Sequence, residues 1–239
     1  MKILDRLPHD TRRYLFSKIN KKRFQRMQSK RLKHDDKGYS FAPFDKSRSI
    51  FVHVPKAAGV SLTNAFFGSL AGGHLTLSDY QLVFSKQDFD NYFKFSFVRN
   101  PWGRVFSAYS FLKKGGMSAA DQDWSSRHLT KYKDFNDFIK NGLIDPELRK
   151  WIHFIPQSDF LYLASGKTLG VDFVGRFENI QEDFSYIANK LGIANTALEH
   201  RNATGSSIAH YKDEYDDESI RIVKEIYSED VRNFGYTFD

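Results

Sequence analysis

Cysteine is absent from this chain of 239 residues, which excludes structural disulfides and metal sites with cysteine ligands. The sequence also has no apolar run of about 18 residues, the length that a membrane-spanning helix needs. Its first twenty residues lack the apolar segment of a secretory signal. Together these absences predict a soluble, cytoplasmic protein.

Acidic residues are missing from one long segment, because none occurs between Thr11 and His34. Residues 1–37 hold 13 Lys and Arg against 4 Asp and Glu, whereas the rest of the chain holds 23 against 25. The net charge of +7 therefore comes from the N-terminal end. We predict a basic, helical arm over residues 1–39 and a single domain over residues 40–239.

The function of this arm stays open at the level of sequence. A basic helix can lie peripherally on the inner face of an acidic membrane, or it can bind a polyanionic substrate. It can also be a solvated segment without a specific function. We expect no nucleic acid partner, because no recognised binding motif accompanies the charge.

Short apolar strands alternate with amphipathic helices in the rest of the chain. An aromatic content of 16% supports a packed core. Strands are predicted at 50–54, 92–98 and 171–177, and helices at 61–70, 101–114, 134–141, 146–154, 179–191 and 217–229. This alternation predicts a three-layer α/β fold, similar to P-loop proteins, with a central, mainly parallel sheet flanked by helices. Residues 74–91 and 115–133 are expected to be loops that line an acceptor pocket.

A tight turn, PKAAGVSL, connects the first predicted strand to its helix. Such a turn directs backbone N–H groups and a helix N-terminus at one point, which suits an anion. Lys56 adds a full positive charge there. The alternative is an ordinary strand–turn–helix connection with a solvated lysine.

A second cation follows the second predicted strand, in the segment RNPWGRVFSAY. Arg99 comes directly after that strand, and Ser107 lies about two helical turns later. The planar guanidinium of an arginine suits a terminal phosphate, because it binds two oxygens at once. Alternatively, Arg99 forms a salt bridge at a helix end and Ser107 is a packing residue. If the two strands are neighbours, Lys56 and Arg99 flank one crevice.

Together the two segments resemble the sulfotransferases that use 3′-phosphoadenosine 5′-phosphosulfate (PAPS). PKAAGVSL is similar to the 5′-phosphosulfate loop, PKxxGxS, and RNPWGRVFSAY to the 3′-phosphate motif, RxPxxRxxSxY. The order and spacing resemble the carbohydrate sulfotransferases related to the heparan and chondroitin enzymes and their bacterial relatives. The segments GRFENIQEDFSYIANKLG and YSEDVRNFGYTF also resemble later landmarks of that family. The resemblance covers roughly residues 50–238 and leaves out the basic arm.

The resemblance implies PAPS as co-substrate, 3′,5′-ADP (PAP) as product, no metal, and a glycan or glycolipid hydroxyl as acceptor. It implies that Lys56 stabilises charge on the leaving group, while Arg99 and Ser107 hold the 3′-phosphate. The loop contacts would come from the residues around Lys56, namely Ala57, Ala58, Gly59, Val60, Ser61 and Leu62. Many members have Thr where this chain has Ala57 and Val60, so altered donor affinity is expected.

The acceptor hydroxyl needs a base, and a neutral imidazole suits this role near pH 7. We choose His74, which follows the Gly72-Gly73 break, where members with a catalytic histidine place theirs. The alternative is a surface or hydrogen-bonding histidine. His153 is a secondary candidate, and His53 is expected to be a buried residue of the first strand. Ser207 and Tyr211, in or beside the loop 202–211, are expected to contact the nucleotide.

Two other classes of function remain open. Ala57 and Val60 are compatible with a module that binds a nucleotide or anion without catalysis. A P-loop kinase-like phosphotransferase is the other alternative, although the turn lacks the Gly-Lys-Ser/Thr ending of that loop. Oligomeric state and acceptor identity cannot be predicted from these patterns.

Overall fold

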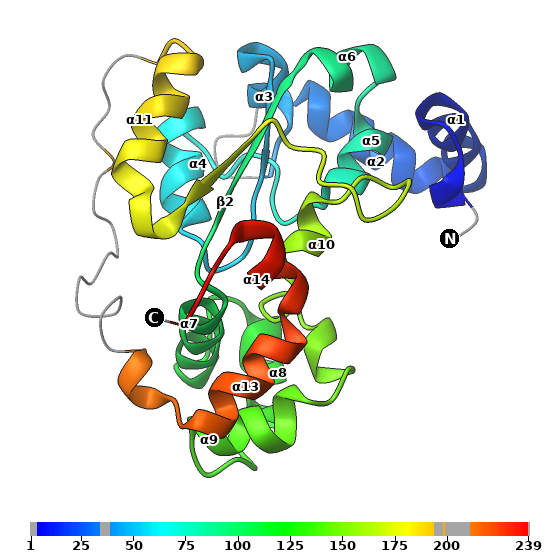
Figure 1. Ribbon diagram of the computed structural model, residues 1–239. Coiled ribbons are helices and arrows are strands. Elements are labelled where there is room, and N and C mark those ends of the chain that lie inside the picture. Colours follow the sequence, from blue (N-terminus) through cyan, green and yellow to red (C-terminus); the bar gives the residue numbers. More distant parts are fainter. Residues whose placement is uncertain (1–3, 34–38, 194–197, 199–210, 239) are drawn as a thin grey trace. The chain divides into compact units, whose positions relative to one another are not determined.

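A computed structural model describes residues 4–33, 39–193, 198 and 211–238, and it forms two compact units (Figure 1). The first unit takes the chain up to Val98 and again from Gln157 to Arg201, and the second takes the remainder. The sequence boundary predicted after residue 39 does not coincide with a boundary between these units.

The first unit is built on a parallel sheet of three strands, β1 (Ser49–Val52), β2 (Phe93–Val98) and β3 (Phe173–Arg176). Their order is β1-β2-β3, with Phe51 opposite Phe95 and Phe95 opposite Phe173. The predicted α/β fold with a parallel sheet flanked by helices is confirmed. Because β1 and β2 are parallel neighbours, the segments after both strands leave the sheet at the same edge.

Aromatic residues join one face of this sheet to its helices. Phe66 of α4 (Gly59–Phe67) lies 5.3 Å from Phe95, measured between ring centroids, and 4.7 Å from Phe184 of α11 (Ile180–Lys190). Figure 1 shows these two helices side by side along the sheet. Burial of these rings stabilises the packing of α4 and α11 on β2, at about 25 cal/mol per Å² of apolar surface.

Short helices of the first unit complete the packing around the sheet. They are α3 (Ala42–Ser47), which contacts β1, and α5 (Leu77–Val83), α6 (Lys86–Asn91) and α10 (Gln157–Leu161). The basic arm forms α1 (His9–Ile19) and α2 (Lys21–Leu32), with a break at Asn20, and both helices pack against α5. Phe16 and Met27 are the buried apolar side chains of these two helices.

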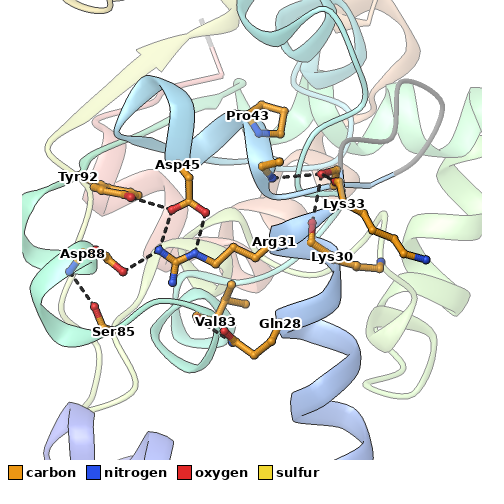
Figure 2. A network of polar contacts seen from close by, with 12 residues as sticks. Gln28, Lys30, Arg31, Lys33, Pro43, Asp45, Val83, Ser85, Asp88 and Tyr92 are labelled. Atoms are coloured by element: carbon orange, nitrogen blue, oxygen red, sulfur yellow. Dashed lines mark hydrogen bonds and ion pairs between the residues drawn. The ribbon is translucent and has the colours of Figure 1, made fainter.

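A network of charges attaches α2 to the rest of its unit (Figure 2). The guanidinium of Arg31 donates two 2.7 Å hydrogen bonds to the carboxylate of Asp45 and one of 2.7 Å to Asp88. The bond from Arg31 is the main cause that lowers the pKa of Asp88. Burial, followed by its bond to Asp45, raises the pKa of Tyr92 to about 12. The arm is therefore fixed to α3 and α6.

The second unit is helical. Its helices are α7 (Pro101–Lys113), α8 (Ala119–His128), α9 (Phe135–Phe138), α13 (Asp217–Ile226) and α14 (Ser228–Phe234), and a π-helical turn follows α9 at Ile139–Leu143. Their shared core contains Trp102, Phe138 and Tyr227. The backbone carbonyl of Trp102 accepts a 2.9 Å hydrogen bond from the Tyr215 hydroxyl, which ties the start of α7 to the segment before α13.

Several predicted elements are wrong in extent or kind. Helix 61–70 is α4, which ends earlier because Gly68 adopts a left-handed φ of 67°. Residues 74–91, expected to be a loop, hold α5 and α6, and the expected loop 115–133 holds α8. Within 146–154 only the short 3-10 helix Leu148–Lys150 forms. The predicted helix 217–229 is divided at Tyr227 into α13 and α14.

The loop predicted at 202–211 lies outside the described residues except for Tyr211. Every helix in the described parts of the chain is too short or too polar to span a bilayer.

Candidate active site

The turn after β1 has the backbone geometry of an anion-binding loop. Lys56 and Ala58 both adopt left-handed conformations, with φ of 69° and 64°, although neither is glycine. Each such residue costs on the order of 1 kcal/mol, a strain that proteins concentrate at functional sites. Ala58 is followed directly by the first helical residue, Gly59. A left-handed residue next to a helical one turns successive N–H groups toward one point and forms a concave cradle for an anion.

Gly59 is required at the start of α4 because a histidine ring occupies the space beside it. A Cβ on Gly59 would lie 1.9 Å from both Cδ2 and Nε2 of His53. His53 follows β1 directly and is buried, as expected for this residue. Any larger residue at position 59 would displace the His53 ring or the loop.

His74 lies beside this loop through its contact with His53. The two ring centroids are 4.2 Å apart, and Nδ1 of His74 is 3.2 Å from the backbone carbonyl oxygen of His53. A carbonyl oxygen only accepts hydrogen bonds, so Nδ1 of His74 carries a hydrogen. In the neutral imidazole, Nε2 is then the atom that takes up a proton. The structure thus brings the predicted base to the predicted anion loop.

The other loop residues differ in exposure. Ala57 is buried and can offer a ligand only its backbone. The predicted amide contact of Leu62 is wrong, because its N–H donates to the Ala58 carbonyl at 3.1 Å as part of α4. Val60 is 42% exposed and Ser61 is partly exposed. Sequence reasoning missed Thr63, whose buried hydroxyl donates to the carbonyls of Gly59 and Val60 at 2.8 and 3.1 Å. This bond consolidates the first turn of α4 behind the loop.

Arg99, in the second unit, lies against the first turn of α7 and beside Tyr211. A Cβ on Gly103 would lie 3.4 Å from Nε of Arg99 and 3.1 Å from the ring of Tyr211. Arg99 and Tyr211 are both buried. Two residues predicted to contact the nucleotide are therefore brought together over a glycine, and Gly103 was not singled out in the sequence.

Ser107 lies one turn beyond Gly103 on the same face of α7, since residues four apart are neighbours on a helix. Its side chain is partly exposed. Asn100 caps the helix, because its Oδ1 accepts from the Trp102 N–H at 3.1 Å and its Nδ2 donates to the Thr237 carbonyl at 2.7 Å. Ser207 lies outside the described residues. Because Lys56 and Arg99 belong to different units, their convergence on one ligand stays a prediction.

His153, the secondary candidate for the base, is engaged inside the second unit. Its Nε2 lies 3.0 Å from a carboxylate oxygen of Asp121, and both side chains are buried. Burial acts to raise the pKa of Asp121, but hydrogen bonds from Ser118 and His153 outweigh this effect and hold the pKa below its usual value. Ser118 and Asp121 also form the capping box of α8. This arrangement favours a structural role for His153.

No group of three or more His, Asp or Glu side chains that could hold a metal occurs in the described ranges. A hollow of about 450 Å³ lies beside His74 in the first unit, lined by α2 on one side and by Gly72 to Leu75 on the other. The position of α2 next to His74 was not predicted from the sequence. The helical spacing of the cations in α2 could be read from the sequence, but the element that they face could not.

Comparison with known proteins gives a family for most of the chain. A model of the sulfotransferase family matches residues 39–237. Carbohydrate sulfotransferase 14 of Danio rerio is 24% identical over 176 residues, which covers 62% of this chain and 47% of the relative. Carbohydrate sulfotransferase 11 of Rattus norvegicus is 25% identical over 183 residues, covering 68% of this chain and 52% of the relative. This chain thus spans about half the length of these two enzymes.

An uncharacterized protein of Archaeoglobus fulgidus is 29% identical over 108 residues, covering 45% of this chain and 74% of that protein. No solved structure shows a significant match. The matched family region includes the turn at Lys56, His74 and the Arg99 segment, and it begins after α2.

Proposed function

The chain belongs to the sulfotransferase family, and from this premise we propose that it transfers a sulfuryl group from PAPS to a hydroxyl of a carbohydrate acceptor, a glycan or a glycolipid. The observation that carries the proposal is the contact of His74 with the anion loop through His53. The turn that would hold the oxyanion and the imidazole that would accept the proton lie together there, and sulfuryl transfer to a hydroxyl needs both groups.

The loop after β1 suits the phosphosulfate end of the donor. The N–H groups from Ala58 to Ser61, which precede the first bonded N–H of α4, supply fixed dipoles, and the helix N-terminus favours negative charge. The Ser61 hydroxyl can add a donor, whereas Ala57 and Val60 cannot. Lys56 would place its ammonium where charge develops as the sulfuryl group leaves.

Arg99 and Ser107 would hold the 3′-phosphate, with the guanidinium of Arg99 binding two phosphate oxygens in parallel. Tyr211 packs beside Arg99 and would line the same subsite. This 3′-phosphate distinguishes PAPS from ATP-like nucleotides. The second unit would therefore select the donor, and the first unit would stabilise the leaving group.

The proposed reaction is a single in-line displacement at sulfur. The acceptor oxygen forms the new S–O bond as the bond between sulfur and the bridging oxygen of the 5′-phosphate breaks. The electron pair of the broken bond stays on that bridging oxygen, beside Lys56. Nε2 of His74 takes the hydroxyl proton, since Nδ1 is committed to the His53 carbonyl. The products are a sulfate ester, 3′,5′-ADP and protonated His74.

The experiment that tests this function has two stages. Titration with 3′,5′-ADP measures donor-site binding, and incubation with radiolabelled PAPS and a pool of glycan and glycolipid acceptors measures transfer. We expect both binding and labelled product. Binding without transfer to any acceptor would favour the non-catalytic module that Ala57 and Val60 leave open. Transfer of phosphate from ATP would instead support a kinase-like reaction.

A further inference from the structure

An arginine of the N-terminal arm binds the first turn of α5, the helix that follows His74. The guanidinium of Arg12, in α1, donates from Nη1 to the backbone carbonyl of Ser78 and from Nη2 to the Ser78 hydroxyl, both at 2.9 Å. Its Nε donates to the carboxylate of Asp5 at 3.1 Å, and the Arg12 side chain is 7% exposed. This guanidinium is therefore engaged by contacts within the first unit.

The N-cap of α5 connects this first turn to His74. The Asp79 N–H donates to the Thr76 hydroxyl at 3.1 Å, and the Thr76 N–H donates to the Asp79 carboxylate at 3.3 Å, which is a capping box. The other carboxylate oxygen of Asp79 accepts a 3.3 Å hydrogen bond from Arg23 of α2. Only Leu75 separates His74 from Thr76. A displacement of the first turn of α5 therefore reaches the imidazole.

Helix α5 depends on such contacts because it is short. It has seven residues, whereas an isolated helix of fewer than about 12–15 residues is marginal in water. Leu77 and Tyr80 are fully buried and attach α5 to the core, but apolar contacts are non-directional. The two donors of Arg12 on one residue of the helix are directional, so they fix the rotation of its first turn.

The arm also contacts the other end of α5. The Gln28 side chain of α2 donates to the Val83 carbonyl at 2.8 Å, and a ring nitrogen of His9 in α1 lies 3.1 Å from the Phe84 carbonyl oxygen. Figure 1 shows both arm helices beside α5. Helix α5 is thus bound to the arm at both of its ends.

The chain on the other side of His74 is more adaptable. The two residues before it are Gly72 and Gly73, with φ of 82° and 65°. Glycine has the widest backbone freedom of all residues, so this side sets the position of His74 less firmly than α5 does. The 3.2 Å contact of Nδ1 of His74 with the His53 carbonyl therefore depends on where α5 begins.

We propose that the arm is a positioning element for the base, in which Arg12 holds the first turn of α5 and thereby keeps Nδ1 of His74 on the His53 carbonyl. This role rests on the proposed function, in which Nε2 of His74 takes the proton of the acceptor hydroxyl. Arg12, Arg23 and Arg31 are all paired within the first unit, so this part of the arm's charge acts internally. Helices α1 and α2 precede residue 39, where the match to the family begins, so the arm lies outside the matched region.

Replacing Arg12 by methionine tests this role in the full chain. Arg12→Met keeps an unbranched side chain but loses all three hydrogen bonds of the guanidinium. The matched control is Arg31→Gln, which disrupts the three hydrogen bonds of another arm arginine to Asp45 and Asp88 and leaves α5 untouched. Circular dichroism checks that both variants are folded at the assay temperature.

The tautomer of His74 reports its position without any substrate. Nitrogen-15 NMR of histidine-labelled protein, assigned by comparison with His74→Asn, separates an Nδ1–H imidazole from an Nε2–H imidazole at a pH where the ring is neutral. The wild type and Arg31→Gln should show His74 with its hydrogen on Nδ1, because the His53 carbonyl accepts from that atom. In Arg12→Met the His74 signals should move toward those of a mixture of both tautomers.

Kinetics then show whether the displaced imidazole slows the chemical step. We expect kcat of Arg12→Met to fall about tenfold with the acceptor found in the pool of glycans and glycolipids, because a misplaced base no longer meets the hydroxyl proton. The KM for that acceptor and the affinity for 3′,5′-ADP should change less than about twofold, as should kcat of Arg31→Gln.

Ser78→Ala provides a milder variant if Arg12→Met folds poorly. It removes the hydroxyl that accepts from Nη2 of Arg12, and alanine is a better helix former than serine, so α5 itself is not weakened. We expect kcat to fall about two- to threefold, with a partial loss of the Nδ1–H form of His74.

The two readouts separate this inference from the proposed function. Failure of the wild type to bind 3′,5′-ADP or to transfer a sulfuryl group contradicts the proposed function, whereas the NMR comparison needs neither. The positioning role is overturned if His74 has the same tautomer in Arg12→Met as in the wild type, or if Arg31→Gln changes the tautomer and kcat as much as Arg12→Met does. If Arg12→Met does not fold, an unchanged tautomer and kcat in Ser78→Ala overturn it.

Discussion

Nδ1 of His74 donates a hydrogen bond to the backbone carbonyl of His53 at 3.2 Å, and the two rings lie 4.2 Å apart. The His53 ring in turn occupies the space where a side chain on Gly59 would begin. A candidate base and the start of the anion loop are thereby linked through one residue. A change at Gly59 is therefore expected to reach His74 as well.

Replacing His74 tests its role as the base. We expect His74→Asn to lower kcat about 100-fold or more, because Asn offers an amide donor toward the His53 carbonyl but no basic nitrogen in place of Nε2. The affinity for 3′,5′-ADP should change less than twofold, and the acidic limb of the pH–rate profile should disappear. If His74→Asn and His74→Ala each lower the affinity for 3′,5′-ADP by the same factor as kcat, the role of His74 is structural instead.

The close approach of Gly59 to His53 gives a second prediction. Gly59→Ala places a methyl group against the imidazole, and we expect overpacking to cost about 1–3 kcal/mol of unfolding free energy. Both nucleotide affinity and kcat should fall, since the ring and loop move together. The control is Gly68→Ala at the other end of α4, where nothing lies within 4 Å. Its left-handed φ should cost about 1 kcal/mol of stability without changing nucleotide affinity. If Gly59→Ala and Gly68→Ala change kcat and nucleotide affinity by the same factor, the steric argument is refuted.

We expect the lysine at position 56 to be needed for catalysis but to lower the free energy of unfolding, because its backbone conformation favours glycine. Its φ of 69° suits glycine, so Lys56→Gly should be more stable to urea than Lys56→Ala. Both variants should lose sulfuryl transfer, because neither carries a charge beside the bridging oxygen, and both should keep the circular dichroism of the wild type. Retained turnover in either variant would contradict the role assigned to Lys56.

The network that anchors α2 predicts a pH-dependent contribution to stability. The folded-state pKa of Asp88 lies below its ordinary value of 3.8, chiefly through its bond from Arg31. The contribution of Asp88 to the free energy of unfolding is therefore fully present above pH 3.8 and is lost as the pH falls through the lower, folded-state pKa. Arg31→Gln should lower the free energy of unfolding by about 1–3 kcal/mol at pH 7, given that the side chains are only 19 to 32% exposed. Urea midpoints of the variant and the wild type should approach each other at pH 3, and a constant difference would argue against the network.

The sequence predicted the strands and the loop well because both depend on local patterns. Apolar runs placed the three strands, and the Pro-Lys-Ala-Ala-Gly turn indicated the cradle before α4. The prediction missed α8, whose residues lack a continuous apolar stripe, although Ser118 and Asp121 form the capping-box pattern that could have indicated it. Helix α4 was extended too far because the prediction placed its end at Gly72-Gly73 and passed over Gly68.

The contacts that build the candidate site were harder to predict because they are not local. His53 and His74 are 21 residues apart, and no periodicity relates them. Arg26 and Lys30 could be assigned to one helix face, but the packing of that face beside Gly73 follows from the Phe41 and Gly72 backbone hydrogen bonds. The sequence therefore indicated the chemistry of single residues better than their partners.

Nucleotide binding tests the central claim most directly, because Lys56 and Arg99 are proposed to hold opposite ends of PAPS. Calorimetry with 3′,5′-ADP and 5′-AMP should be run on the wild type, Lys56→Gly and Arg99→Lys, the last of which keeps the charge but loses the planar fork. We predict that Arg99→Lys weakens 3′,5′-ADP at least tenfold and changes 5′-AMP less than twofold, whereas Lys56→Gly weakens both. Equal weakening of the two nucleotides by Arg99→Lys, or no effect on either, would contradict the account.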